Sequence, residues 1–294
     1  MSARTRVLTI AGLATAIAVA AVVGATLLQS HGSSSGSAPG SAVTKPRAGA
    51  PPLILDLGVQ SDAQARASAQ ASALYAKGHR AAAGAIFERY DSLPARIGAA
   101  FAAWPDGGLD TLKSLVASNP SSALAELHLG YAYLWSGRNA DAVSAWRQAV
   151  KVEPDSSAAV SAADLLHPSF LPGLPYIVTT LEPPARVTKL PAAQELAALA
   201  KAAARPDADA KLLYGVALWN LRLPLSAERQ FRAAAALAPD DPTALTAAAV
   251  GAFSKARPVL AFSKLGPLTG RFPRSAVVRF HLAVLLLWSR ELAK

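Results

Sequence analysis

Seven spaced residues between positions 123 and 156 constrain the fold of this chain more than any other feature. Small residues recur where two antiparallel helices would have to cross closely, and a glycine stands where the first helix would end. A proline follows where the second helix would end, because proline cannot continue a helix. Bulky aromatic residues are expected to fill the space between this hairpin and the next. The seven residues are Gly130, Tyr133, Gly137, Ala142, Trp146, Ala149 and Pro154.

The same pattern returns in other ranges of 34 residues, once the 51-residue range 157–207, which is 34 plus 17 residues long, is allowed for. The range 208–241 repeats it most fully, with Gly215, Ala227, Phe231, Ala234 and Pro239 in phase. The ranges 89–122 and 242–275 repeat it in part. The strings HLGYAYLWS, from His128, and HLAVLLLWS, from His281, also stand at one repeat phase. The spacing therefore predicts an array of helical hairpins.

This unit resembles the tetratricopeptide repeat (TPR), a helix-turn-helix of 34 residues, over roughly residues 61–294. The resemblance implies an all-α fold, an α-solenoid of stacked antiparallel hairpins spanning residues 53–294, whose first helices line a groove. It implies an apolar, aromatic groove, either for a protein or peptide partner or filled by neighbouring segments of the chain. The residues carried over as partner-binding are Leu124, Leu127, Tyr131, Trp135, Leu212, Val216 and Trp219.

A proline-rich insert at about residues 167–189 interrupts the array. Its prolines forbid a continuous helix, yet Phe170, Tyr176, Ile177 and Val178 make it too apolar for a free loop. We expect it to pack back on the solenoid or to line its groove. The last repeat, from Ala276, supplies only its first helix, so it is predicted to be incomplete or to pair with another subunit.

The N-terminal region predicts a membrane anchor. Residues 7–28 carry no charge and would span about 33 Å as a helix, enough for a bilayer core. Basic residues within 1–6 place that short end in the cytoplasm and the rest outside. A cleaved signal peptide, which would leave a secreted protein, is the alternative. Residues 29–52, rich in Gly, Ser and Pro, predict a flexible linker.

The charge of the chain is uneven. Between Lys255 and Lys294, eight basic residues stand against Glu291 alone. This excess is consistent with a weak contact to an anionic surface, or with a solvated face. Aromatic residues do not interleave with the basic ones as they do in nucleic-acid grooves, so no nucleic-acid partner is expected.

No catalytic chemistry is evident in the sequence. The chain has no cysteine, and none of its five histidines has a metal-ligand spacing. No phosphate-binding or nucleophile motif occurs, so we expect no enzyme activity, no catalytic residues, no metal and no cofactor. His128 and His281 share one repeat position, which favours a structural role for both.

Together these features predict a membrane-anchored TPR scaffold or adaptor that mediates protein–protein interactions outside the bacterial cytoplasmic membrane. Self-association is an open alternative for the partner. Two further alternatives are a cell-envelope or cytochrome-assembly factor, and an accessory region of a longer enzyme.

Overall fold

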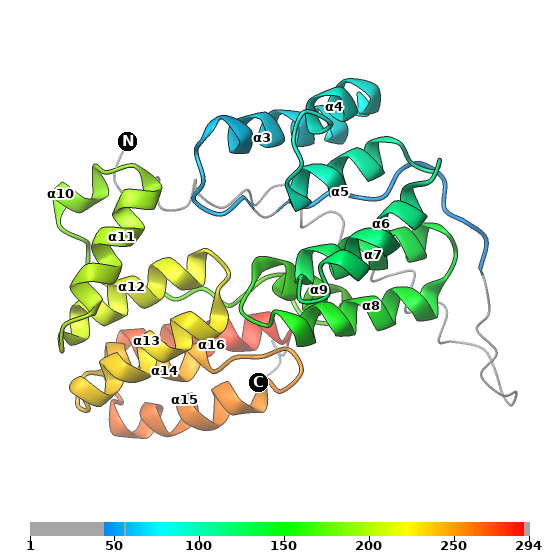
Figure 1. Cartoon of the computed structure of the whole chain (residues 1–294). Helices are drawn as coiled ribbons and strands as arrows, with labels where there is room; N and C mark the ends of the chain where they lie inside the picture. The colour runs from blue at the N-terminus through cyan, green and yellow to red at the C-terminus, as the bar shows by residue number, and fades with distance from the viewer. Residues whose placement is uncertain (1–43, 56, 291–294) are drawn as a thin grey trace, which may run out of the picture. The chain divides into compact units, whose positions relative to one another are not determined.

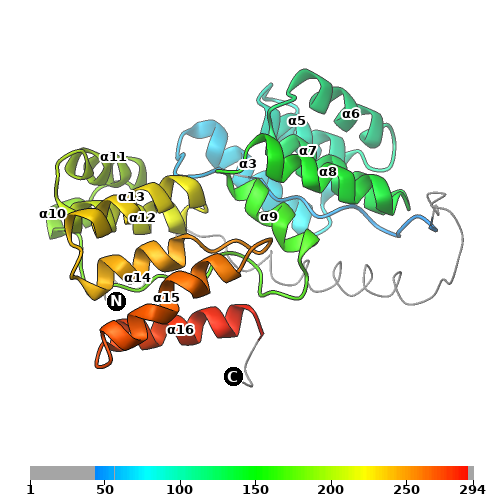
Figure 2. The ribbon, with the colours of Figure 1, turned by 90° about the horizontal axis from the view of Figure 1, so that it is seen from below.

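The computed structural model describes residues 44–55 and 57–290, which fold into two compact helical units with a boundary after Leu166. Figures 1 and 2 show the helices of each unit packed as consecutive antiparallel hairpins. The N-terminal unit contains α3 (Ala63–Ala76), α4 (Arg80–Phe87), α5 (Leu93–Ala102), α6 (Gly108–Ser118), α7 (Ala123–Trp135), α8 (Asn139–Val152) and α9 (Ser157–Leu166).

The C-terminal unit has the same architecture and its own hydrophobic core. All regular secondary structure of the described residues is helical, which confirms the predicted all-α, TPR-like fold. The helices of the C-terminal unit are α10 (Ala185–Thr188), α11 (Ala192–Ala203), α12 (Ala208–Asn220), α13 (Pro224–Leu237), α14 (Pro242–Gly251), α15 (Val259–Arg271) and α16 (Ala276–Trp288).

Local sequence fixes where these helices begin. The side chains of Ser122 and Asp207 accept hydrogen bonds from backbone N–H groups in the first turns of α7 and α12, and Asp241 does the same for α14. Gly137 follows α7 with φ of 75°, the left-handed conformation that glycine adopts at little cost. These capping residues set the short turns that make each helix pair antiparallel.

Small residues set how closely the paired helices approach. A Cβ added to Gly130 of α7 would lie 2.2 Å from the indole nitrogen of Trp146 in α8. A Cβ added to Gly215 of α12 would lie 2.6 Å from the ring of Phe231 in α13. The structure thus places Trp146 against its own hairpin, over Gly130, where the repeat pattern suggested a position between hairpins. The side chains of Trp146 and Phe231 are both fully buried.

The predicted continuous array is divided in two at the proline-rich insert. The insert carries no helix from residue 167 to 184, the short helix α10 forms its last part, and α11 and α12 follow it. The prolines at 168, 172 and 175 explain the gap, since each removes a backbone donor and blocks helical geometry. The predicted hairpin positions on either side of the insert still hold.

The predicted membrane anchor, residues 7–28, lies outside the described residues, as does most of the predicted linker. In the described ranges, 44–55 and 57–290, no helix is both long and apolar enough to cross a bilayer. The end of the predicted linker, residues 44–52, packs on the N-terminal unit and is part of its structure.

Candidate functional site: two strap sites

A non-helical segment, residues 44–55, lies along the N-terminal unit, and we call it the first strap (Figure 1, blue). The backbone N–H of Ile54 donates to Nε2 of His128 at 3.2 Å, and that of Arg47 donates to the Trp135 carbonyl at 2.9 Å. The hydroxyl of Tyr75 donates to the Pro51 carbonyl at 2.6 Å. Groups of α3 and α7 thus hold the strap by its main chain.

A second strap, residues 168–181 of the insert, lies on the C-terminal unit. The backbone N–H of Val178 donates to Nε2 of His281 at 2.9 Å, and that of Leu171 donates to the Trp288 carbonyl at 3.0 Å. The indole N–H of Trp219 donates to the Pro175 carbonyl at 2.7 Å. The insert therefore packs on the helices of its own unit, as the sequence predicted.

The two straps are bound in the same way and in the same register. In each strap, one backbone N–H bonds a Trp carbonyl, a proline carbonyl accepts from an aromatic side chain, and a second backbone N–H bonds a His imidazole. The residues that make these three contacts have the same spacing in both straps. Gly49 and Gly173 both have positive φ, 77° and 80°, two residues before the bonded proline. The sequences GAPPLI, from Gly49, and GLPYIV, from Gly173, share the pattern Gly-x-Pro-x-apolar-apolar. The two units thus share one structural arrangement, in which helices bind a non-helical strap through its main chain.

The two histidines are the polar centre of each site. Nδ1 of His128 bonds the Leu124 carbonyl and Nδ1 of His281 bonds the Val277 carbonyl, both at 2.7 Å. Since Nε2 of each accepts a backbone N–H, each imidazole is neutral with its proton on Nδ1. Burial lowers the pKa of His128 to about 4 and lowers the pKa of His281 as well. Protonation would remove the acceptor that the strap needs.

Apolar and aromatic groups complete each site. Leu53, Ile54 and Leu55 pack on the N-terminal core, and Ile177 is buried in the C-terminal core. The Arg47 guanidinium lies over the Trp135 ring at 5.4 Å. These contacts remove strap side chains from water and orient the main chain for its hydrogen bonds.

The structure places the seven predicted groove residues on the helices that carry the strap sites. Trp219 and Trp135 contact a strap directly, the first through its indole N–H and the second through its carbonyl. Five of the seven are buried and two, Trp135 and Val216, are half-buried. The buried members are Leu124, Leu127, Tyr131, Leu212 and Trp219.

Sequence reasoning missed His128, His281 and Tyr75 as strap-binding groups. The signal was present: the shared HL motif and the two Gly-x-Pro-x-apolar-apolar segments occur once per unit. It also missed Lys255, one of the basic residues near the C-terminus. Its ammonium is buried and donates to the Leu171 carbonyl at 2.6 Å, so it serves the second strap.

In the part of the chain that the structure describes, no three His, Asp or Glu side chains lie close enough together to hold a metal ion. The two sites instead offer hydrogen-bond acceptors and donors spaced to hold a peptide main chain.

Comparisons with known proteins add little to this geometry. No protein-family model matches the chain, and no curated protein matches it. Among solved structures, TTC0263, described as a thermophilic TPR protein in Thermus thermophilus, is similar to it. That match has 20% sequence identity and a TM-score of 0.28, and covers 76% of this chain and 100% of the other. The TPR-like description of the fold rests on the hairpins themselves.

Proposed function

We propose that this chain is a membrane-anchored TPR-like scaffold that mediates protein–protein interactions on the outer side of the bacterial cytoplasmic membrane. The observation that carries the binding part is the duplicated strap site. Each unit already holds a non-helical segment through main-chain hydrogen bonds and buried apolar side chains. A partner segment with the same chemistry would be bound by the same groups.

The strap sites suit a peptide ligand because they bind main-chain atoms. The histidine accepts one N–H of the segment, and the Tyr75 hydroxyl or Trp219 indole donates to a carbonyl three residues earlier. Main-chain bonds set the register while apolar side chains supply selectivity. A partner segment with a Gly-x-Pro-x-apolar-apolar pattern would therefore fit best.

A partner would have to compete with the strap. The strap is covalently joined to its own site, so its effective concentration there is on the order of millimolar. A partner segment would occupy the site when it binds more tightly, or when the strap is weakened. Strap release would then control partner binding.

Site-specific photo-crosslinking in native membranes tests the binding proposal. A photoreactive residue replaces Val216, a half-buried residue of α12 and one of the predicted groove residues, in the full chain. The matched control replaces Arg232, which is exposed on α13. We expect an intermolecular adduct from position 216 that increases when His281→Phe, which has no acceptor for the Val178 N–H, weakens the second strap. Equal yields from both positions, with no change in the His281→Phe background, would refute the binding proposal.

The location is tested separately. The uncharged residues 7–28, preceded by basic residues, support an anchor with the helical units outside. A reporter fused after Lys294 should be active when it requires the extracytoplasmic side and inactive when it requires the cytoplasm. The reverse pattern would overturn the orientation without touching the binding proposal.

A further inference from the structure

An open hollow of about 320 Å³, which we call the cavity, lies on the surface of the hairpin formed by α7 and α8. No group that holds the first strap lines it, so it is a separate feature of the N-terminal unit. Its volume is at the lower end of the range of ligand pockets, enough for one side chain or a small molecule. Two of its walls are apolar, from Leu129 and Ala145. The polar lining residues are Glu126, Tyr133, Asp141, Ser144 and Gln148.

Glu126 is the residue that marks this cavity as a binding site. It is 7% exposed, it lines the cavity, and no described residue forms an ion pair with it. Its carboxylate oxygens are not among the buried side-chain atoms that lack a partner in the described residues, so they meet solvent at the cavity. An occupant that displaces this solvent has to supply a positive charge in its place, because buried charges in proteins are normally paired. Burial also raises the pKa of Glu126. Its position in the first turn of α7 favours an acidic residue there through the helix dipole, but does not explain the burial.

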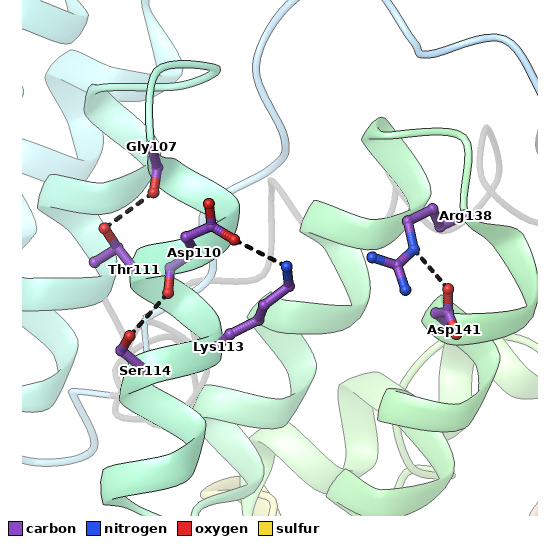
Figure 3. Close-up of polar contacts among 7 residues, drawn as sticks. All are labelled: Gly107, Asp110, Thr111, Lys113, Ser114, Arg138 and Asp141. Carbon is purple, nitrogen blue, oxygen red and sulfur yellow. Dashed lines mark hydrogen bonds and ion pairs between the residues drawn. The ribbon is translucent and has the colours of Figure 1, made fainter.

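The rim of the cavity already binds a guanidinium group. Nε of Arg138 donates to Oδ2 of Asp141 at 2.6 Å, and its guanidinium lies over the Tyr133 ring at 4.5 Å. Figure 3 shows this pair at the start of α8, apart from the Asp110–Lys113 pair on α6. Tyr133 and Asp141 also line the cavity. Carboxylate and aromatic face are the two groups that recognise guanidinium.

The charge inside the cavity is unbalanced. Glu126 and Asp141 both line it, whereas no lysine, arginine or histidine among the described residues does. Arg138 neutralises Asp141 from the rim, which leaves Glu126 without a cation. An occupant that pairs with Glu126 must therefore carry a positive charge, with hydrogen-bond donors for the remaining polar lining and a stem that suits Leu129.

We propose that this cavity binds one guanidinium or ammonium group on a short aliphatic stem, with Glu126 as its counter-ion. The aliphatic stem lies against Leu129 and Ala145, and the head group reaches Glu126. The amide of Gln148 and the hydroxyl of Ser144 supply further polar contacts. The source with this chemistry is the arginine or lysine side chain of another protein, and a free polyamine-like molecule is the other source that the test distinguishes. This proposal is independent of strap binding.

The test measures binding to the full chain in detergent micelles by isothermal titration. Three probes are compared: N-acetyl-arginine methylamide, agmatine, and N-acetyl-citrulline methylamide, in which a neutral urea replaces the guanidinium. Two variants accompany them. Glu126→Gln removes the charge at nearly constant shape, and Glu88→Gln makes the same change at an exposed position of the same unit.

We expect the arginine probe to bind and the citrulline probe not to bind. Glu126→Gln should weaken arginine binding at least tenfold, and Glu88→Gln should leave it unchanged. Tighter binding of the arginine probe than of agmatine supports a protein side chain, and the opposite order supports a free amine. No binding of either cation, equal binding of citrulline, or an equal effect of the two variants would overturn the proposal. Thermal unfolding of Glu126→Gln confirms that the variant is folded.

Discussion

Nε2 of the fully buried His128 accepts the backbone N–H of Ile54, which ties a strap residue to a histidine far along the chain. The same relationship joins Val178 to His281 in the other unit. A neutral imidazole suits this role because one nitrogen donates within its own helix while the other is left to accept. A histidine at this repeat position therefore marks a strap-bearing helix.

This relationship predicts acid sensitivity of the N-terminal unit. The pKa of His128 is about 4 in the folded state and about 6.5 when unfolded, so the unfolded state binds more protons between these values. The stability contributed by neutral His128 is fully present above pH 6.5 and is lost as the pH falls towards 4. The loss should reach about 3 kcal/mol. Urea unfolding of the full chain across this range measures it.

His128→Gln is the control, because an amide oxygen can still accept the Ile54 N–H and does not titrate in this range. The difference in unfolding free energy between wild type and variant should shrink as the pH falls from about 7 to about 4.5. A difference that is constant with pH would show that His128 does not titrate on unfolding.

The close approach of α7 and α8 makes a second prediction. Gly130→Ala would place a Cβ within 2.2 Å of the Trp146 indole nitrogen, which donates to the Leu127 carbonyl at 3.2 Å. Relieving this overlap should cost about 1–3 kcal/mol of unfolding free energy. Gly270→Ala in α15, where a Cβ would meet nothing within 4 Å, should instead be neutral or stabilise by up to about 1 kcal/mol. Equal effects in thermal unfolding would contradict this account of the crossing.

The helical part of the fold could be predicted from sequence because its signal is periodic. Gly130 and Gly215 recur at the repeat phase where Trp146 and Phe231 cross, so packing and pattern coincide. The straps could not be predicted in the same way. Residues 44–55 and 168–181 have no periodicity, and proline-rich composition is equally typical of a linker. Their order comes from contacts with helices distant in the chain.

The candidate sites, like the fold, could be predicted only where a residue has a repeat position. Trp219 was predicted to face the groove from its repeat position, but its bond to the Pro175 carbonyl depends on the path of the insert. Glu126 had no distinguishing sequence signal. Its low exposure and its place in the cavity lining follow from how α7 and α8 pack, which composition and spacing do not specify.

Gly137 contacts the start of the first strap, so a substitution there should weaken the packing of the strap on the N-terminal unit. Its φ is 75°, and an added Cβ would lie 1.9 Å from the Thr44 carbonyl oxygen, where the strap begins. Gly137→Ala should therefore both strain the turn and displace residues 44–47. Gly78→Ala is the matched control, since Gly78 has φ of 84° and open space around its Cβ position. Limited proteolysis should cut the strap faster in the first variant alone. Equal cleavage in both would mean that backbone strain accounts for the effect.

Glu126 gives the last prediction, through its cost to stability. Burial raises its folded pKa above the unfolded value, so the folded state binds more protons than the unfolded state between the two. Its contribution to stability is therefore greatest below the unfolded pKa and is lost as the pH rises through the folded pKa. Glu126→Gln removes this loss and should stabilise the chain more at about pH 7 than at about pH 4, as measured by urea unfolding. A Glu126→Gln variant that is less stable than wild type at neutral pH would mean that the ionised carboxylate has a stabilising partner in the folded protein.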